Sequence, residues 1–147
     1  MEIYFSILLK KSLNIKELNL NEELVYWGEQ SFSQEPKIFK WETLITLTQY
    51  ECEGFVIDYL FGNTLKLNDF YSYKLELKKT SKNINTIIEF LKLINRNLNE
   101  WYFFTFNEDY ESYTHKTIMN EKDILISLSE LSNNEFKKNL VLMKRKI

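Results

Sequence analysis

The chain has 147 residues, a formal net charge of −2 and 44% apolar residues, of which an unusual share is aromatic. This length fits one domain around one core, so we expect residues 1–147 to form a single domain. The net charge disfavours a globally basic nucleic-acid-binding protein, and the lone cysteine, Cys52, excludes an intramolecular disulfide and a cysteine-rich zinc site.

The N-terminal half is predicted to contain three strands and one helix. Residues 2–9 are nearly all apolar, which predicts a central strand buried on both faces. An interrupted apolar stripe predicts a helix over residues 15–30, and the only proline lies in residues 31–40, a predicted loop. Residues 43–49 and 55–61 are predicted to be strands joined by a hairpin-like turn.

The middle of the chain carries the clearest periodicities. Residues 70–77 alternate between two sets of side chains, which predicts a strand with one buried and one solvated face. Residues 82–98 form the strongest predicted helix. We expect its apolar stripe to pack on a sheet that contains residues 3–9 and 101–106. The stripe consists of Ile84, Ile87, Ile88, Leu91, Ile94 and Leu98.

The C-terminal part is predicted to add a buried strand at 101–106, a polar strand at 110–116 and a helix at 121–132. Asn120 and Asp123 are suited to begin that helix. Its predicted inward residues are Ile124, Leu125, Leu128 and Leu131. The pattern leaves open whether residues 134–145 form a helix or a strand.

The order of these elements favours an α+β fold over an α/β fold, because the strands come in runs instead of alternating with helices. We therefore expect a mostly antiparallel sheet with helices packed on one face, ferredoxin-like in style.

The composition also bears on origin and location. Alanine is absent, and glycine and proline are rare, which indicates an AT-rich genome. The N-terminus lacks the charge order of a signal peptide, and no apolar run approaches the roughly 20 residues that span a bilayer. We therefore expect a bacterial cytoplasmic protein with no membrane partner.

The chain carries no recognisable nucleophile or phosphate-binding motif. His115 is the only histidine, and it lies in a predicted polar strand without a Gly-x-Ser-x-Gly motif. Cys52 stands between Glu51 and Glu53, whose carboxylates disfavour a reactive thiolate. The three glycines cannot build a glycine-rich phosphate loop. We predict no catalytic residue, no metal and no cofactor.

A metal-dependent nuclease is the main alternative. Asp58, followed on a later strand by Glu76-Leu77-Lys78, resembles the PD-(D/E)xK nuclease signature, although Ile57 stands where the signature has proline. The resemblance implies that Asp58 and Glu76 hold Mg²⁺ while Lys78 positions or activates a water. A solvated ion pair on the strand is the commoner explanation of such residues.

An acidic turn rich in tyrosine is the preferred binding site. Tyrosine beside a charged rim is typical of protein-binding hot spots. Residues 99–123 hold six acidic and two basic residues, a net charge of −4, which suits a partner with a basic surface. The same turn is also compatible with a solvated loop that binds nothing. The predicted partner-binding residues are Glu108, Asp109, Tyr110, Glu111 and Tyr113.

In its size, its lack of catalytic motifs, its alanine-free composition and its acidic-aromatic stretch 100–113, the chain resembles immunity proteins of bacterial toxin–immunity systems, such as contact-dependent growth inhibition. This resemblance implies a non-catalytic cytoplasmic protein that binds and neutralises a cognate toxin. A phage-encoded inhibitor of a host defence protein is a further alternative, because it would carry the same kind of surface on a different target.

Overall fold

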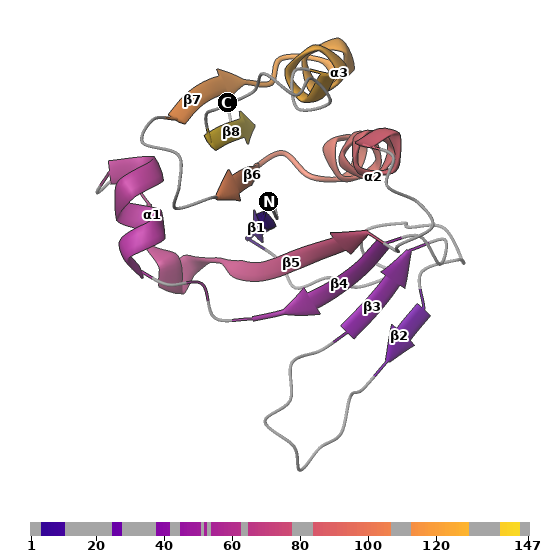
Figure 1. The fold of residues 1–147 in the computed structure, drawn as a ribbon, viewed down its shortest axis with the longest axis horizontal. Helices are drawn as coiled ribbons and strands as arrows, with labels where there is room; N and C mark the ends of the chain where they lie inside the picture. Colours follow the sequence, from indigo (N-terminus) through magenta and orange to yellow (C-terminus); the bar gives the residue numbers. More distant parts are fainter. Residues whose placement is uncertain are drawn as a thin grey trace.

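The computed structural model describes residues 4–10, 25–27, 38–41, 45–50, 52, 54–62, 65–77, 84–106, 113–129 and 139–144. These residues form one sheet and three α-helices (Figure 1). The strands are β1 (Tyr4–Leu9), β2 (Val25–Trp27), β3 (Ile38–Trp41), β4 (Ile45–Gln49), β5 (Tyr71–Leu77), β6 (Trp101–Phe106), β7 (Tyr113–Thr117) and β8 (Asn139–Lys144). The helices are α1 (Gly54–Phe61), the 3-10 turn η2 (Leu67–Asp69), α2 (Ile84–Asn97) and α3 (Glu121–Ser129).

The eight strands lie in the order β2-β3-β4-β5-β1-β6-β8-β7. All neighbouring pairs are antiparallel except β7 and β8, which are parallel. Strand β1 is central as predicted, with Ile7 opposite Tyr73 of β5 and Phe103 of β6. The predicted α+β class with a mostly antiparallel sheet is confirmed, and the ferredoxin-like style stays a prediction.

Helices α2 and α3 share one face of the sheet, as predicted (Figure 1). In the predicted stripe, Ile87, Ile88, Leu91 and Ile94 are buried, because their helical spacing places them on one side of α2. They pack with β1 and β6 in the larger core cluster. Helix α2 therefore supplies the main apolar cover of the sheet.

The opposite face is covered by α1, for which the sequence predicted a strand over residues 55–61. That prediction is wrong. The buried residues Val56, Ile57, Leu60 and Phe61 recur with helical spacing and pack on the sheet beside Leu8, Tyr102, Phe104 and Val141. An apolar run this short does not discriminate a strand from a helix, so tertiary packing decided it. Gly62, with φ of +62°, follows the last turn in the left-handed conformation that commonly ends helices.

The predictions for residues 15–40 are wrong where the structure describes them. Residues 25–27 form β2 within the predicted helix, and residues 38–40 belong to β3 within the predicted loop. The rest of that region lies outside the described residues. The segment left open at 134–145 contains strand β8.

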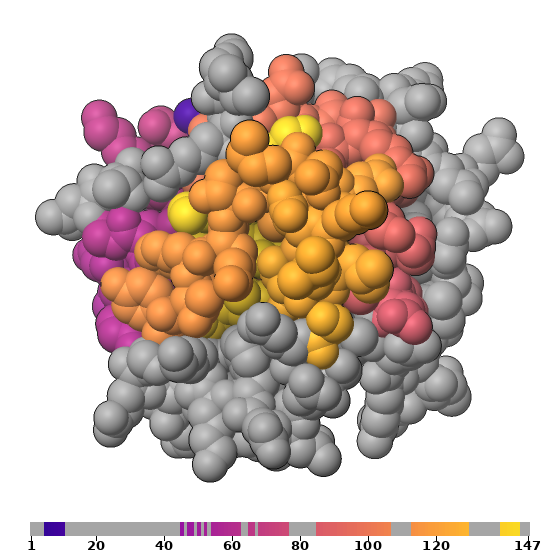
Figure 2. Space-filling view, turned by 90° about the horizontal axis from the view of Figure 1, so that it is seen from above, coloured from indigo at the N-terminus to yellow at the C-terminus, as the bar shows by residue number. Residues whose placement is uncertain are grey.

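Helix α3 begins as predicted, and one of its predicted inward residues faces solvent instead. The side-chain oxygen of Asn120 accepts the N–H of Asp123 at 3.3 Å, and the Asp123 carboxylate accepts the N–H of Asn120 at 3.1 Å. This reciprocal pair forms a capping box. Leu125 was predicted to face inward but is exposed, whereas Ile124 and Leu128 are buried; Leu131 lies outside the described residues. Figure 2 shows α3 and β7 on one face of the molecule.

Candidate protein-binding surface

One of the five predicted binding residues is described. Tyr113 begins β7, and its side chain is 40% exposed. The other four predicted residues, Glu108, Asp109, Tyr110 and Glu111, lie outside the described residues. Tyr113 is therefore the predicted binding residue from which the candidate surface is identified.

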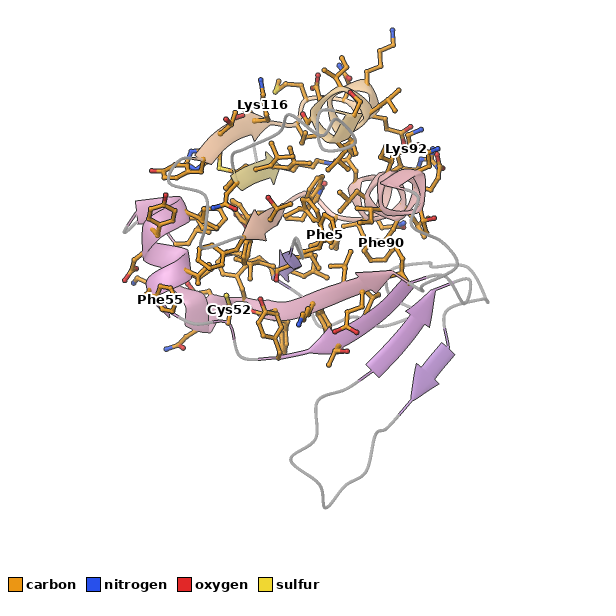
Figure 3. All side chains as sticks on the ribbon, viewed as in Figure 1. Phe5, Cys52, Phe55, Phe90, Lys92 and Lys116 are labelled. Carbon is orange, nitrogen blue, oxygen red and sulfur yellow. The ribbon has the colours of Figure 1, made fainter. Side chains whose placement is uncertain are left out.

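Tyr113 belongs to a cluster of rings contributed by α1 and β7. Its ring meets that of Tyr59 edge-on, with centroids 5.3 Å apart, and lies 4.9 Å from the ring of His115. Phe55, one helical turn before Tyr59, is 61% exposed and meets Phe106 edge-on at 6.2 Å. Figure 3 shows Phe55 at the outer edge of α1. We call Phe55, Tyr59, Tyr113 and His115 the aromatic surface.

The imidazole of His115 joins β7 to the end of α1. Its Nε2 lies 2.6 Å from the carbonyl oxygen of Leu60, and since a carbonyl can only accept, Nε2 carries the proton. Carbonyls in the last turn of a helix lack an intrahelical donor, and this bond satisfies one of them. The imidazole also stacks on Phe61, with centroids 6.3 Å apart. His115 thus holds α1 in place beside Tyr113.

The inner side of α1 explains why the outer rings are fixed. Phe61 packs edge-on against Tyr102 at 5.7 Å and Phe104 at 6.0 Å, which seats the helix on the sheet. Phe55 and Tyr59 lie on the more exposed side of α1, where Phe55 contacts Phe106 of β6 and Tyr59 contacts Tyr113 of β7. Rings already held by ring contacts lose less conformational entropy when a partner binds.

Two residues of the nuclease alternative, Asp58 and Glu76, lie on a helix and on a strand, not on two strands. Asp58 is exposed on helix α1, not inside a strand as predicted. Glu76 is exposed on β5 and pairs with Lys74 at 3.7 Å, while Lys78 lies outside the described residues. Within the described part of the chain, no group of three or more His, Cys, Asp or Glu side chains could hold a metal ion.

Helices α2 and α3 are joined by an exposed ion pair away from the aromatic surface. Arg96 Nε donates to Glu121 Oε1 at 2.5 Å, and Arg96 Nη2 donates to Glu121 Oε2 at 3.2 Å. This hydrogen bond lowers the pKa of the Glu121 carboxyl from its ordinary value and raises the pKa of Arg96. The pair contributes to the attachment of α3 and has no part in the candidate site.

Sequence reasoning missed Phe55 and Tyr59, because a strand over 55–61 would have placed them in the sheet. The apolar pairs at 56–57 and 60–61 are four residues apart, as on a helix, but residues 55 and 59 are also apolar, so the run does not discriminate a helix from a strand. No sequence signal could have paired Tyr59 with Tyr113, which is distant in the chain.

Comparison of the chain with protein-family models, with curated proteins and with solved structures found no match. None of the described helices is long and apolar enough to cross a membrane.

Proposed function

We propose that this protein is a non-catalytic inhibitor of the immunity-protein kind, which binds and neutralises a cognate bacterial toxin. The observation that carries the proposal is the aromatic surface, in which Tyr59 and Tyr113 are 38% and 40% exposed while held against each other. Tyrosine and histidine rings that present an apolar body and a polar tip are suited to a protein partner.

Charge adds a second line of support. The predicted acidic residues Glu108, Asp109 and Glu111 immediately precede Tyr113 in the chain. Acidic groups beside anchored rings favour a basic partner, because exposed charges speed the encounter while buried rings slow dissociation. The proposed surface therefore combines Tyr59 and Tyr113 as anchors with the acidic turn as the steering element.

The proposal is tested by toxin neutralisation and by binding to the protein encoded beside this gene. Tyr59→Ala and Tyr113→Ala should each weaken binding by about 2 kcal/mol or more, as expected of hot-spot tyrosines. Tyr71→Ala is the matched control, since Tyr71 is 42% exposed but lies on β5, four strands from β7. Circular dichroism checks that each variant folds.

Three outcomes decide between the alternatives. Equal binding by the Tyr113→Ala and Tyr71→Ala variants would show that the interface lies elsewhere. Binding to a host defence protein in place of a toxin would favour the phage-encoded inhibitor. Metal-dependent cleavage of DNA by the purified chain, abolished by Asp58→Asn, would favour the nuclease.

The acidic turn is tested by its effect on the rate of association. Replacing Glu108, Asp109 and Glu111 with lysine changes the local charge by six units, so the variant should associate more slowly with a basic partner. The difference should shrink as salt rises, because exposed charges are screened within about 8 Å at physiological ionic strength. Unchanged association kinetics in low salt would exclude the turn from the interface.

A further inference from the structure

Helix α1 carries one charged side chain, and it lies beside the exposed rings. Asp58 is exposed and follows Phe55 by three residues, while Tyr59 follows Phe55 by four. Residues at these spacings are neighbours on a helix surface, and helical side chains lean toward the N-terminal end. Asp58 and Tyr59 therefore both lean toward Phe55, which is 61% exposed. We call Phe55, Asp58 and Tyr59 the α1 patch.

The strand register places the only lysine of β7 on the other face of the sheet. Lys116 lies opposite Leu142 of β8, which belongs to the core cluster covered by α2 and α3. His115 lies opposite Val141, which packs beneath α1. Because side chains alternate across a strand, the side of β7 that faces α1 carries no lysine or arginine. Lys116 therefore does not offset the charge of Asp58.

The other described bases around α1 are matched or point elsewhere. Lys10 pairs with Glu100 at 3.7 Å, and Lys144 donates to the carbonyl of Asn95 on α2, across the sheet. Asp58 forms no ion pair with the described residues. The segment that follows α1 adds one base and one acid, Lys66 and Asp69. The charge beside the exposed rings of α1 is therefore negative.

The acidic turn has the same sign as the α1 patch. Residues 107–112, between β6 and β7, contain three acids and no base, and they directly precede Tyr113. The ring of Tyr113 contacts that of Tyr59 in the α1 patch, with centroids 5.3 Å apart. A partner that is attracted by the turn and reaches the rings therefore needs a positive group at the α1 patch.

The chemistry of the α1 patch discriminates between kinds of anchor. An apolar anchor on these rings would remove water from the Asp58 carboxylate without giving it a hydrogen bond, which costs free energy. An ammonium pairs with a carboxylate but is a strongly hydrated point charge. A guanidinium does both, because its planar face stacks on an aromatic ring while its N–H groups donate to a carboxylate. A ring and a carboxylate one helical turn apart therefore favour arginine.

We propose that the α1 patch binds an arginine side chain of the partner protein, with the guanidinium stacked on Phe55 and hydrogen-bonded to Asp58. The inference rests on the proposed function, because it specifies the residue that a basic partner places on the aromatic surface. Asp58 then determines specificity by its charge, and Phe55 by its ring. Tyr59, held against Tyr113, borders the same arginine.

The probe is a peptide selected on the full chain from a displayed library of random sequences of about twelve residues, long enough to carry an anchor and its flanking residues. We expect the enriched peptides to share one arginine. Replacing that arginine with lysine should weaken binding about threefold or more, because the charge remains while the stacking is lost.

Asp58→Asn is the main variant, with Glu89→Gln as its matched control. Both remove one exposed carboxylate, but Glu89 lies on α2, on the other face of the sheet. Loss of a charge-assisted hydrogen bond should weaken peptide binding about tenfold in Asp58→Asn, while Glu89→Gln should leave it unchanged. Phe55→Leu should weaken it about threefold through the lost stacking. Circular dichroism checks that each variant folds.

A double-mutant cycle separates a direct contact from general attraction between charges. If Asp58 pairs with the shared arginine, Asp58→Asn should have no effect on a peptide in which alanine replaces that arginine. An equal effect on both peptides would show that Asp58 attracts the peptide only through its field and would overturn the inference. So would enrichment of peptides without arginine, no enrichment, or equal binding by Asp58→Asn and Glu89→Gln.

Binding to the protein encoded beside this gene separates this inference from the proposed function. Neutralisation that is lost in Tyr113→Ala but keeps its full strength in Asp58→Asn would reject the arginine anchor and leave the proposed function standing. Absence of neutralisation by the parent chain, together with arginine peptides that depend on Asp58, would reject the proposed function and leave the arginine site standing.

Discussion

Helices α1 and α2 pack on opposite faces of the same sheet, but their solvent sides differ. On α2 the exposed residues are polar, as at Asn85, Glu89 and Arg96. On α1 two of the exposed residues are aromatic, Phe55 and Tyr59. Since a ring left in solvent does not contribute its full burial free energy to folding, packing alone does not explain these two residues. Helix α2 covers the core, whereas α1 covers the core and also presents exposed aromatic side chains.

The largest expected effect concerns α2. Leu91 is fully buried, so Leu91→Ala should lower the free energy of unfolding by about 2–5 kcal/mol through lost burial and the cavity left behind. Urea unfolding followed by circular dichroism measures this change. Glu89→Ala, on the exposed side of the same helix, should stay within about 0.5 kcal/mol of the parent. Equal values for the two variants would contradict the assignment of α2 as the main cover of the sheet.

A smaller effect is expected where β7 holds α1. His115→Ala removes the hydrogen bond to the Leu60 carbonyl and should lower the free energy of unfolding by about 1 kcal/mol. Hydrogen exchange of the α1 amides should accelerate, because the helix loses a partner at its end. Lys116→Ala on the same strand is the control and should leave α1 exchange unchanged. If His115→Ala lowered the free energy of unfolding as much as Leu91→Ala, α1 would contribute as much to the stability of the core as α2.

The smallest effect concerns the exposed pair that joins α2 to α3. The pKa of Glu121 is lowered in the folded protein, chiefly by its hydrogen bond to Arg96. The ion pair therefore stabilises the fold above the ordinary pKa of the carboxyl, and this stabilisation is lost as pH falls through the lowered folded pKa.

Glu121→Gln should accordingly be slightly less stable than the parent at neutral pH, and the difference should disappear in acid. Added salt should also reduce it, since the pair is exposed. Unfolding measured across pH in both proteins checks this expectation. A difference that grows toward low pH would contradict the assigned direction.

The strength of a periodic signal explains which elements could be predicted. Helix α2 and strand β6 were found because their patterns are long or continuous, and the start of α3 was found because capping is local chemistry. Helix α1 was mistaken for a strand because its few apolar residues fit both periods. Tyr113 was predicted to be a binding residue from the tyrosines and acidic residues near it in the chain. Its contact with Tyr59 depends on tertiary packing.

The sequence by itself determined the α+β class, the stripe of α2, strand β5 and the capping box of α3, since each depends on residues close together in the chain. Within β5 the predicted alternation is wrong at two positions, because Tyr71 is exposed and Ser72 is buried. Only the tertiary structure decided that α1 is a helix, that β8 lies between β6 and β7, and that rings from α1 and β7 meet. The parallel pairing of β7 with β8 requires a long crossover connection, and no local pattern specifies which strand edge such a connection reaches. The edge and the aromatic surface are therefore products of long-range packing.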